Sequence, residues 1–378
     1  MASRSGFPIL AAMLHPDSKK SFGYEKSLDG VRAIAVLLVM VGHLGLVYAG
    51  GLGVDIFFVL SGYLITAILV SEFSATGQIS LKKFYARRAL RILPAVILLL
   101  LVLNIFVTIS QPSDQAATLR WDSLGALFYI ANWLRAFGRD LGILGHLWSL
   151  SIEEQVYLLW PITLGFLLSR KLSTNQIILV VALAVILVNL DRFYLYHGIQ
   201  SFNRIYNGLD TRADALLIGC ALGLSGYDLF SSRIVGLLGL IGAAFVACVL
   251  FRGHPVPADF QVPFGLTIGG TLFALGVVFA LAAILSNRES IFGKVLRLPP
   301  LVWTGRLSYG LYLWHYPVFT FVGAWFPEMP TLQLMALKVF ATFLCATISY
   351  YSLERPCLTL KTKFSVIKTR ERLADASV

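Results

Sequence analysis

An arginine and a histidine share one face of the first long apolar segment of the chain. The segment reads LDGVRAIAVLLVMVGH over residues 28–43 and places Arg32 eleven positions before His43. Eleven residues make about three turns of an α-helix and span roughly 16 Å along its axis. An imidazole deep in an apolar helix suits a general base, and an arginine at the mouth suits an anionic, long-armed reactant. A histidine bonded to a backbone carbonyl between packed helices is the structural alternative.

Two more arginines, Arg88 and Arg91, stand three positions apart in FYARRALRILP over residues 84–94. Residues three apart lie on one helix face. The planar guanidinium group binds phosphate through paired hydrogen bonds, so this face is a candidate site for the phosphates of a nucleotide-type donor. The alternative is a positively charged anchor that meets lipid phosphates, and spacing alone slightly favours that alternative.

Carboxylates follow in two further motifs. In HLWSLSIEEQVYLLWP, residues 146–161, Glu153 and Tyr157 lie one turn apart and form the better inward-facing stripe. Adjacent residues of a helix point about 100° apart, so we expect only one of Glu153 and Glu154 to face a given site. In GVDIFFVLSGYLIT, residues 53–66, Asp55 either stabilises the start of its helix or orients His43, and the sequence favours neither interpretation.

Four other residues are candidates for contact with substrate: Trp148, Asp210, Arg212 and His315. Asp210 and Arg212 belong to DTRADALLIG, residues 210–219, at one end of an apolar run. Pairing within this motif, which also contains Asp214, makes a structural ion cluster the more economical interpretation. The aromatic residues around His315 are typical of a membrane-interface belt, but His315 lies about nine residues inside an expected helix and is a candidate to line a cavity.

Several common kinds of site have no signature in the chain. The sequence contains no phosphate-binding glycine loop, no HExxH or GxSxG motif and no cluster with metal-ligand spacing, so we expect no metal. Its four cysteines include no CxxC pair and predict neither a disulfide framework nor a zinc site.

The composition indicates what must position these residues. Hydrophobic residues make up 57% of the 378 positions and charged residues 13%, whereas soluble proteins have about 45–50% and 25%. We therefore predict an all-α polytopic membrane protein, a bundle of about ten transmembrane helices of roughly 20 residues each. The candidate spans are residues 31–49, 53–71, 92–110, 150–169, 176–191, 209–225, 233–251, 265–285, 307–326 and 332–353. A weaker segment at 122–137 is expected to be re-entrant or interfacial.

Basic residues predict the topology. With both termini cytoplasmic and 122–137 not crossing, 23 of the 31 lysines and arginines are cytoplasmic, 7 lie outside and Lys338 lies within the last span. The positive-inside rule thus explains the net charge of +11 without nucleic acid as a partner. The resulting division is a cytoplasmic tail at 1–27, a membrane domain at 28–356 and a basic cytoplasmic tail at 357–378.

Two classes of function fit a membrane bundle with this polar interior. One is a transferase that takes a cytoplasmic donor and an acceptor within or across the bilayer. The other is a secondary transporter that uses histidine and carboxylates as a proton relay. Transporters often contain internal repeats with interrupted helices, and no such pairing is visible here, which favours the enzyme.

Taken together, the motifs resemble the membrane acyltransferase type 3 family. The resemblance rests on the motifs quoted above together with SYGLYLWHYP, residues 308–317, and a closing Glu354-Arg355-Pro356. These motifs occur in the family's order and cover residues 25 to 356. The resemblance implies a ten-helix fold and transfer of acetyl or other short acyl groups from acyl-CoA to hydroxyls of carbohydrates and similar acceptors.

The resemblance also assigns roles to residues. The family's arginine–histidine motif falls on Arg32 and His43, its paired arginines on Arg88 and Arg91, and its glutamate on Glu153. The arginines would hold the phosphates of acyl-CoA, most simply acetyl-CoA, at the cytoplasmic mouth.

At the other end of the donor, His43 would take the proton from the acceptor hydroxyl, or form an acyl-histidine intermediate. Asp55 or Glu153 would orient the imidazole. Some members of the family carry a C-terminal esterase-like domain. The printed sequence has no room for one, so we expect transfer to be completed within the bundle.

The expected partners are a lipid bilayer, here the plasma (inner) membrane, and a carbohydrate or glycosylated small-molecule acceptor. Surface polysaccharide, a lipid-linked sugar, a secreted oligosaccharide and a macrolide-like molecule all fit. A second copy of this chain, in a homo-oligomer, is a further candidate partner.

Overall fold

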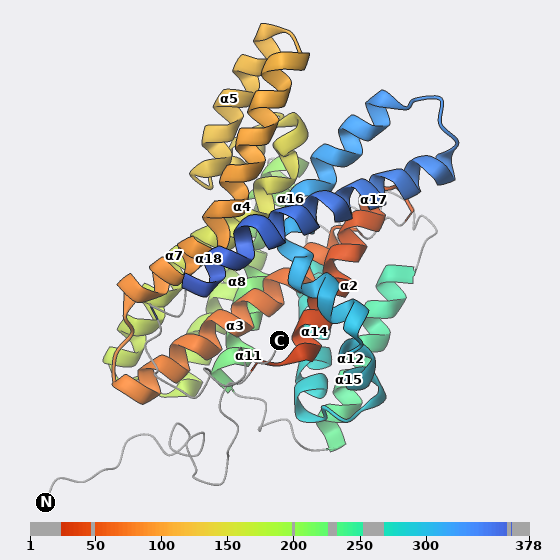
Figure 1. The fold of residues 1–378 in the computed structure, drawn as a ribbon. Helices are drawn as coiled ribbons and strands as arrows, with labels where there is room; N and C mark the ends of the chain where they lie inside the picture. The colour runs from red at the N-terminus through yellow and green to blue at the C-terminus, as the bar shows by residue number, and fades with distance from the viewer. Residues whose placement is uncertain are drawn as a thin grey trace, which may run out of the picture.

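The computed structural model describes residues 24–46, 50–198, 201–225, 233–251, 268–360 and 364. Within these ranges the chain is helical and contains no strand, which confirms the all-α class (Figure 1). The two expected tails fall largely outside the described residues. The helices are α2 Lys26–His43, α3 Leu52–Thr76, α4 Leu81–Ser110, α5 Ser113–Leu127, α6 Ala131–Ala136, η1 Gly142–Leu147, α7 Trp148–Ser169, α8 Thr174–Gly198, α9 Phe202–Asn207, α10 Leu209–Arg212, α11 Asp214–Ser225, α12 Arg233–Phe251, α14 Gly270–Ser286, α15 Ile291–Leu296, α16 Pro299–Trp325, α17 Thr331–Ser349, η4 Tyr350–Glu354 and α18 Arg355–Leu360.

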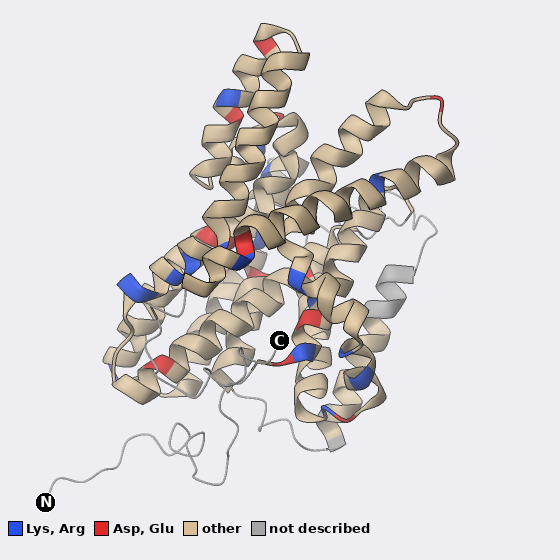
Figure 2. Ribbon diagram, viewed as in Figure 1, with Lys and Arg blue, Asp and Glu red and all other residues tan. Residues whose placement is uncertain are grey.

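Four stretches among the described residues are long and apolar enough to cross a membrane. They are Leu52–Thr76, Leu81–Ser110, Thr174–Gly198 and the continuous helix Thr331–Leu360. Long parts of α4 and α16 carry no charge, and many of the charged residues lie near the middle of the view or at the lower ends of helices (Figure 2). The molecule is therefore a multi-pass membrane protein, whereas the number of ten crossings remains a prediction.

Several predicted segments have different boundaries in the structure; the span at 209–225, for example, comprises α10 and α11. The span predicted at 31–49 is helix α2, which begins earlier and ends at His43, because the backbone turns at Gly45 with a positive φ of 76°. The weak segment at 122–137 is not one helix. It contains the end of α5, a turn in which Tyr129 has a φ of 53°, and the short helix α6.

Small residues bring two helix pairs into backbone contact. A Cβ atom at Gly62 of α3 would overlap the carbonyl oxygen of Leu216, and one at Gly219 of α11 would overlap that of Val59. Helix α16 lies along α2 in the same way, with Gly305 against the backbone of Asp29. Lipid supplies little hydrophobic driving force between helices, so close packing of this kind holds the bundle together.

We expect Gly219→Ala to destabilise the protein although alanine is the better helix former. The added methyl group meets backbone that cannot move aside, and overpacking of this kind costs about 1–3 kcal/mol. The apparent melting temperature in detergent should fall by several degrees.

The matched control is Gly165→Ala in α7. A Cβ atom there would lie 3.6 Å from the side chain of Ile79, an ordinary contact, so the melting temperature should stay or rise. A Gly219→Ala protein as stable as the wild type would contradict the tight contact of α3 with α11.

Candidate functional site

Three histidines from separate elements form a histidine cluster: His43 at the end of α2, His146 in η1 and His315 in α16. The ring centroids of His43 and His315 are 5.0 Å apart, and those of His146 and His315 are 5.3 Å apart. His315 is completely buried and His146 nearly so, whereas His43 is exposed. His43 is therefore the member of the cluster that a reactant can reach.

The hydrogen bonds of this cluster determine which ring nitrogen of each neutral imidazole carries the hydrogen. Nδ1 of His315 lies 2.7 Å from the carbonyl oxygen of Tyr312, so this nitrogen donates and Nε2 carries the lone pair. Nε2 of His315 lies 3.3 Å from Nδ1 of His43, which is also 2.9 Å from the carbonyl oxygen of Val39. Nδ1 of His43 is thus the donor, and its Nε2 is left as a base.

A second centre lies around Glu153. Its Oε1 accepts hydrogen bonds from the Ser61 hydroxyl at 2.7 Å, the Tyr157 hydroxyl at 2.6 Å and Nη2 of Arg88 at 3.1 Å. The predicted stripe of Glu153 and Tyr157 is confirmed. The expectation that only one glutamate reaches the site is wrong, because the same Nη2 lies 3.3 Å from Glu154. A long arginine side chain can bridge two acids that point in different directions.

The three predicted donor-binding arginines form an arginine cluster: Arg32, Arg88 and Arg91. They lie close enough together for the charges of Arg32 and Arg88 to act on Arg91. Arg32 pairs with Asp29 at 2.8 Å. Among the residues that the structure describes, no acceptor bonds to the half-buried Arg91. The cluster therefore has a cation available for an anionic ligand.

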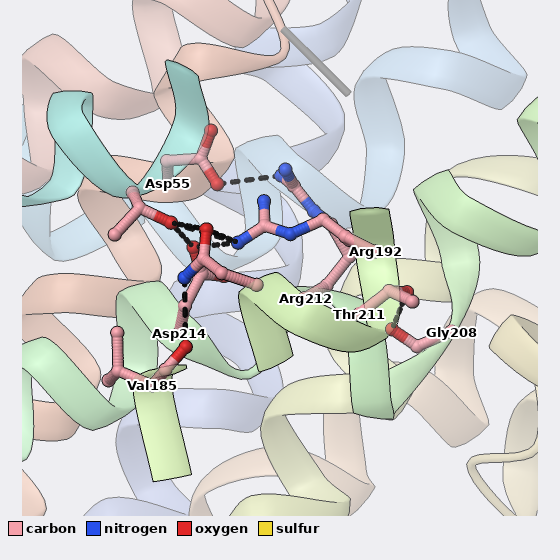
Figure 3. Close-up of polar contacts among 9 residues, drawn as sticks. Asp55, Val185, Arg192, Gly208, Thr211, Arg212 and Asp214 are labelled. Atoms are coloured by element: carbon pink, nitrogen blue, oxygen red, sulfur yellow. Dashed lines mark hydrogen bonds and ion pairs between the residues drawn. The ribbon is translucent and has the colours of Figure 1, made fainter. Parts of the chain in front are cut away.

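Asp55 takes part in a different network (Figure 3). Its Oδ1 lies 2.6 Å from Nη2 of Arg212, and Nη2 of Arg192 lies 2.5 Å from Oδ2 of Asp214. Both pairs are buried. The structure thus brings Asp55 to Arg212 and not to His43.

The expected pairing within residues 210–214 is also wrong. Asp210 pairs with Arg204, whereas Arg212 and Asp214 pair with α3 and α8. The reason is that α10 ends at Arg212 and α11 begins at Asp214, so the motif spans two helices that face different partners. Trp148 packs on Tyr206 with ring centroids 4.8 Å apart, beside the guanidinium of Arg212.

Sequence reasoning missed His146, Arg192 and Tyr312. The hydroxyl of Tyr312 donates to the carbonyl oxygen of His146 at 2.8 Å and lies 2.5 Å from Oγ of Ser149. An arginine within a largely apolar helix is a signal of a buried partner, and this signal would have identified Arg192. In the described ranges no group of three histidine, cysteine or acidic residues has the geometry of a metal site.

Comparison with known proteins places this geometry in context. A family model described as "Acyltransferase domain" matches residues 25–351. The chain is 36% identical over 349 residues to "O-acetyltransferase OatA" of Staphylococcus aureus, covering 88% of this chain and 57% of the relative. It is 36% identical over 352 residues to "Peptidoglycan O-acetyltransferase OatA" of Listeria monocytogenes, covering 88% and 56%. No solved structure matches.

The buried pair of Asp55 and Arg212 predicts a large stability effect. Asp55→Asn leaves a guanidinium unpaired inside the bundle, which should cost about 3–5 kcal/mol. Asp210→Asn is the control, because the side chain of Asp210 is 43% exposed and its pair should contribute less than about 1 kcal/mol.

Thermal unfolding in detergent compares the two variants. If Asp55→Asn melted like the wild type and lost only turnover, Asp55 would belong to the catalytic machinery instead.

Proposed function

This chain belongs to the acyltransferase type 3 family of membrane O-acyltransferases, and on that premise we propose that it transfers an acetyl or other short acyl group from acyl-CoA to a hydroxyl of a carbohydrate. The chain spans a little over half the length of the relatives named above, at 57% and 56%. The name of the Listeria relative includes peptidoglycan, and we propose peptidoglycan or a similar cell-wall polysaccharide as the acceptor. The family assignment removes the basis for the alternative of a secondary transporter.

One observation carries the proposal: the base and one arginine of the proposed anion site lie on the same helix. His43 ends α2 with Nε2 available, and Arg32 lies about three turns earlier beside Arg91. The spacing of roughly 16 Å suits a donor whose phosphates bind the arginine cluster while its extended arm reaches the histidine cluster.

In the proposed reaction, Nε2 of His43 accepts the proton of the acceptor hydroxyl as its oxygen attacks the thioester carbon. The carbon–oxygen bond forms, the carbon–sulfur bond breaks, and the proton passes on to the departing thiolate. His315 holds Nδ1 of the imidazolium, so it takes the orienting role that the sequence offered to Asp55 or Glu153. The alternative of an acyl-histidine intermediate uses the same nitrogen as nucleophile.

The other candidate residues of the sequence analysis support the histidine and arginine clusters or lie apart from them. We assign Glu153 to holding Arg88, because three hydrogen bonds converge on its Oε1. Asp55 and Arg212 brace the helices near Trp148, and Asp210 lies at the surface.

We place the protein in the plasma membrane with ten crossings, both termini cytoplasmic and residues 122–137 not crossing. The charge distribution supports this orientation, which puts the donor site inside and the acceptor outside. Membranes containing the protein should transfer label from radiolabelled acetyl-CoA to a cell-surface or secreted carbohydrate. A purified chain that never consumed an acyl-CoA would refute the proposal.

His43→Gln should abolish transfer. Glutamine keeps a hydrogen-bonding group of similar reach but cannot accept the proton, so the rate should fall about 10²–10⁴-fold while donor binding persists. The wild-type rate should also fall on acidification, because only neutral imidazole accepts the proton. A matched control is His197→Gln in α8, outside the histidine cluster, which should keep full activity. Retained transfer in His43→Gln would leave Glu153 as the next candidate.

Arg91→Ala should weaken acetyl-CoA binding more than it affects the acceptor. The loss of a charge-assisted contact costs about 1.5–3 kcal/mol, or roughly 10–150-fold in the dissociation constant. Arg87→Ala is the control on the same helix, since Arg87 pairs with Glu72. Equal donor affinities in the two variants would reduce Arg91 to a membrane anchor.

A further inference from the structure

Between α6 and α7, one hydrogen bond joins two side-chain amides, each of which has one further polar atom without a partner in the described part of the chain. Nε2 of Gln155 donates to the carbonyl oxygen of Tyr129 at 2.7 Å and to Oδ1 of Asn132 at 2.9 Å. Oε1 of Gln155 and Nδ2 of Asn132 are buried without a hydrogen-bond partner in the described part of the chain. Asn132 is completely buried. Buried polar atoms are normally bonded, so this amide pair, Asn132 and Gln155, is short of a partner.

The orientation of the amide pair is determined by the backbone. A carbonyl oxygen can only accept, so the atom of Gln155 that faces Tyr129 must be the amide nitrogen. That nitrogen also faces Asn132, which must present its oxygen. What remains free is one acceptor on Gln155 and one donor on Asn132. Tyr129 itself holds a φ of 53°, an uncommon conformation for a bulky residue that is often found at functional sites.

The helices that carry the amide pair also carry residues that contact the arginine and histidine clusters. Gln155 directly follows Glu154, which contacts Arg88, and Tyr129 lies close enough to feel the charges of both. On the other side, Arg135 of α6 donates to the carbonyl oxygen of Gly145 at 2.6 Å, next to His146, and its charge acts on His43.

A free acceptor beside a free donor complements two neighbouring secondary amides, because the C=O and N–H of one trans amide point in opposite directions. The carbonyl of one ligand amide would accept from Nδ2 of Asn132, and the N–H of the next would donate to Oε1 of Gln155. The pantetheine arm of coenzyme A carries secondary amides between its phosphate end and its thioester end. We propose that Asn132 and Gln155 bind the successive amides of this arm and so set how far the acyl group reaches toward His43. This inference rests on the proposed function, because it requires a thioester donor of that class.

The test compares three acetyl donors: acetyl-CoA, S-acetyl-pantetheine, which lacks the phosphates, and S-acetyl-2-mercaptoethanol, which lacks the amides as well. Asn132→Leu removes the free donor of the amide pair. We expect kcat/KM to fall about tenfold for the first two donors and to stay unchanged for the third. Arg91→Ala should lower kcat/KM for acetyl-CoA alone, because only this donor carries the phosphates.

Two further variants keep the result interpretable. Asn132→Asp retains the oxygen that Gln155 bonds, so it serves if the leucine variant does not fold, and it should show the same donor dependence. Asn104→Leu is the matched control, since Asn104 also has a buried unpartnered oxygen but bonds Ser123 near the junction of α4 and α5. It should leave the ratio among the donors unchanged.

The outcomes separate the two proposals. A wild-type protein inactive with every donor overturns the proposed function and this inference with it. An active wild type whose Asn132 variants lose rate equally with all three donors overturns this inference alone, because the amide pair then only supports the fold. Asn132 variants with wild-type rates for all three donors would also overturn this inference, since water would then satisfy the free atoms of the amide pair.

Discussion

The backbone contact between α2 and α16 determines where the reactive groups lie. Gly305 rests on the main chain of Asp29, so the two helices meet without intervening side chains. Farther along the same pair, His43 meets His315 at hydrogen-bonding distance. The donor–acceptor distance of a hydrogen bond can vary by only a few tenths of an ångström. A methyl group added at Gly305 would push α2 and α16 apart by more than that. The geometry of the imidazoles therefore depends on a glycine far from them.

Charge pairing imposes a second constraint. The buried guanidinium of Arg212 meets Asp55, and that of Arg192 meets Asp214, because an unpaired ion inside the bundle would be costly. Arg91, by contrast, has no bonded acceptor among the described residues. The charges of Arg32 and Arg88 act against its own, and the charge of Glu153 offsets them in part. An arrangement of this kind is stabilised when an anion binds and relieves the repulsion.

The composition predicted the all-α class, and helical periodicity predicted the stripe of Glu153 and Tyr157, because both depend on individual helices. Neither could predict contacts between helices that are distant in sequence. The partner of Asp55 is 157 positions away and that of His43 is 272 positions away. The ion pairing expected within residues 210–214 failed because the backbone changes direction there. The unfilled amide pair depends on a turn at Tyr129 that no periodic pattern encodes.

The direction in which α2 runs has an electrostatic consequence. Peptide dipoles add along a helix to roughly half a positive charge at its N-terminus and half a negative charge at its C-terminus. Helix α2 begins at Lys26, near Arg32, and has His43 in its last turn. Its positive end thus faces the side where phosphates are proposed to bind, and its negative end faces the imidazole that gains a proton. The dipole of this one helix therefore favours phosphate binding at its N-terminus and protonation of the imidazole at its C-terminus. A helix that ran in the opposite direction would disfavour both.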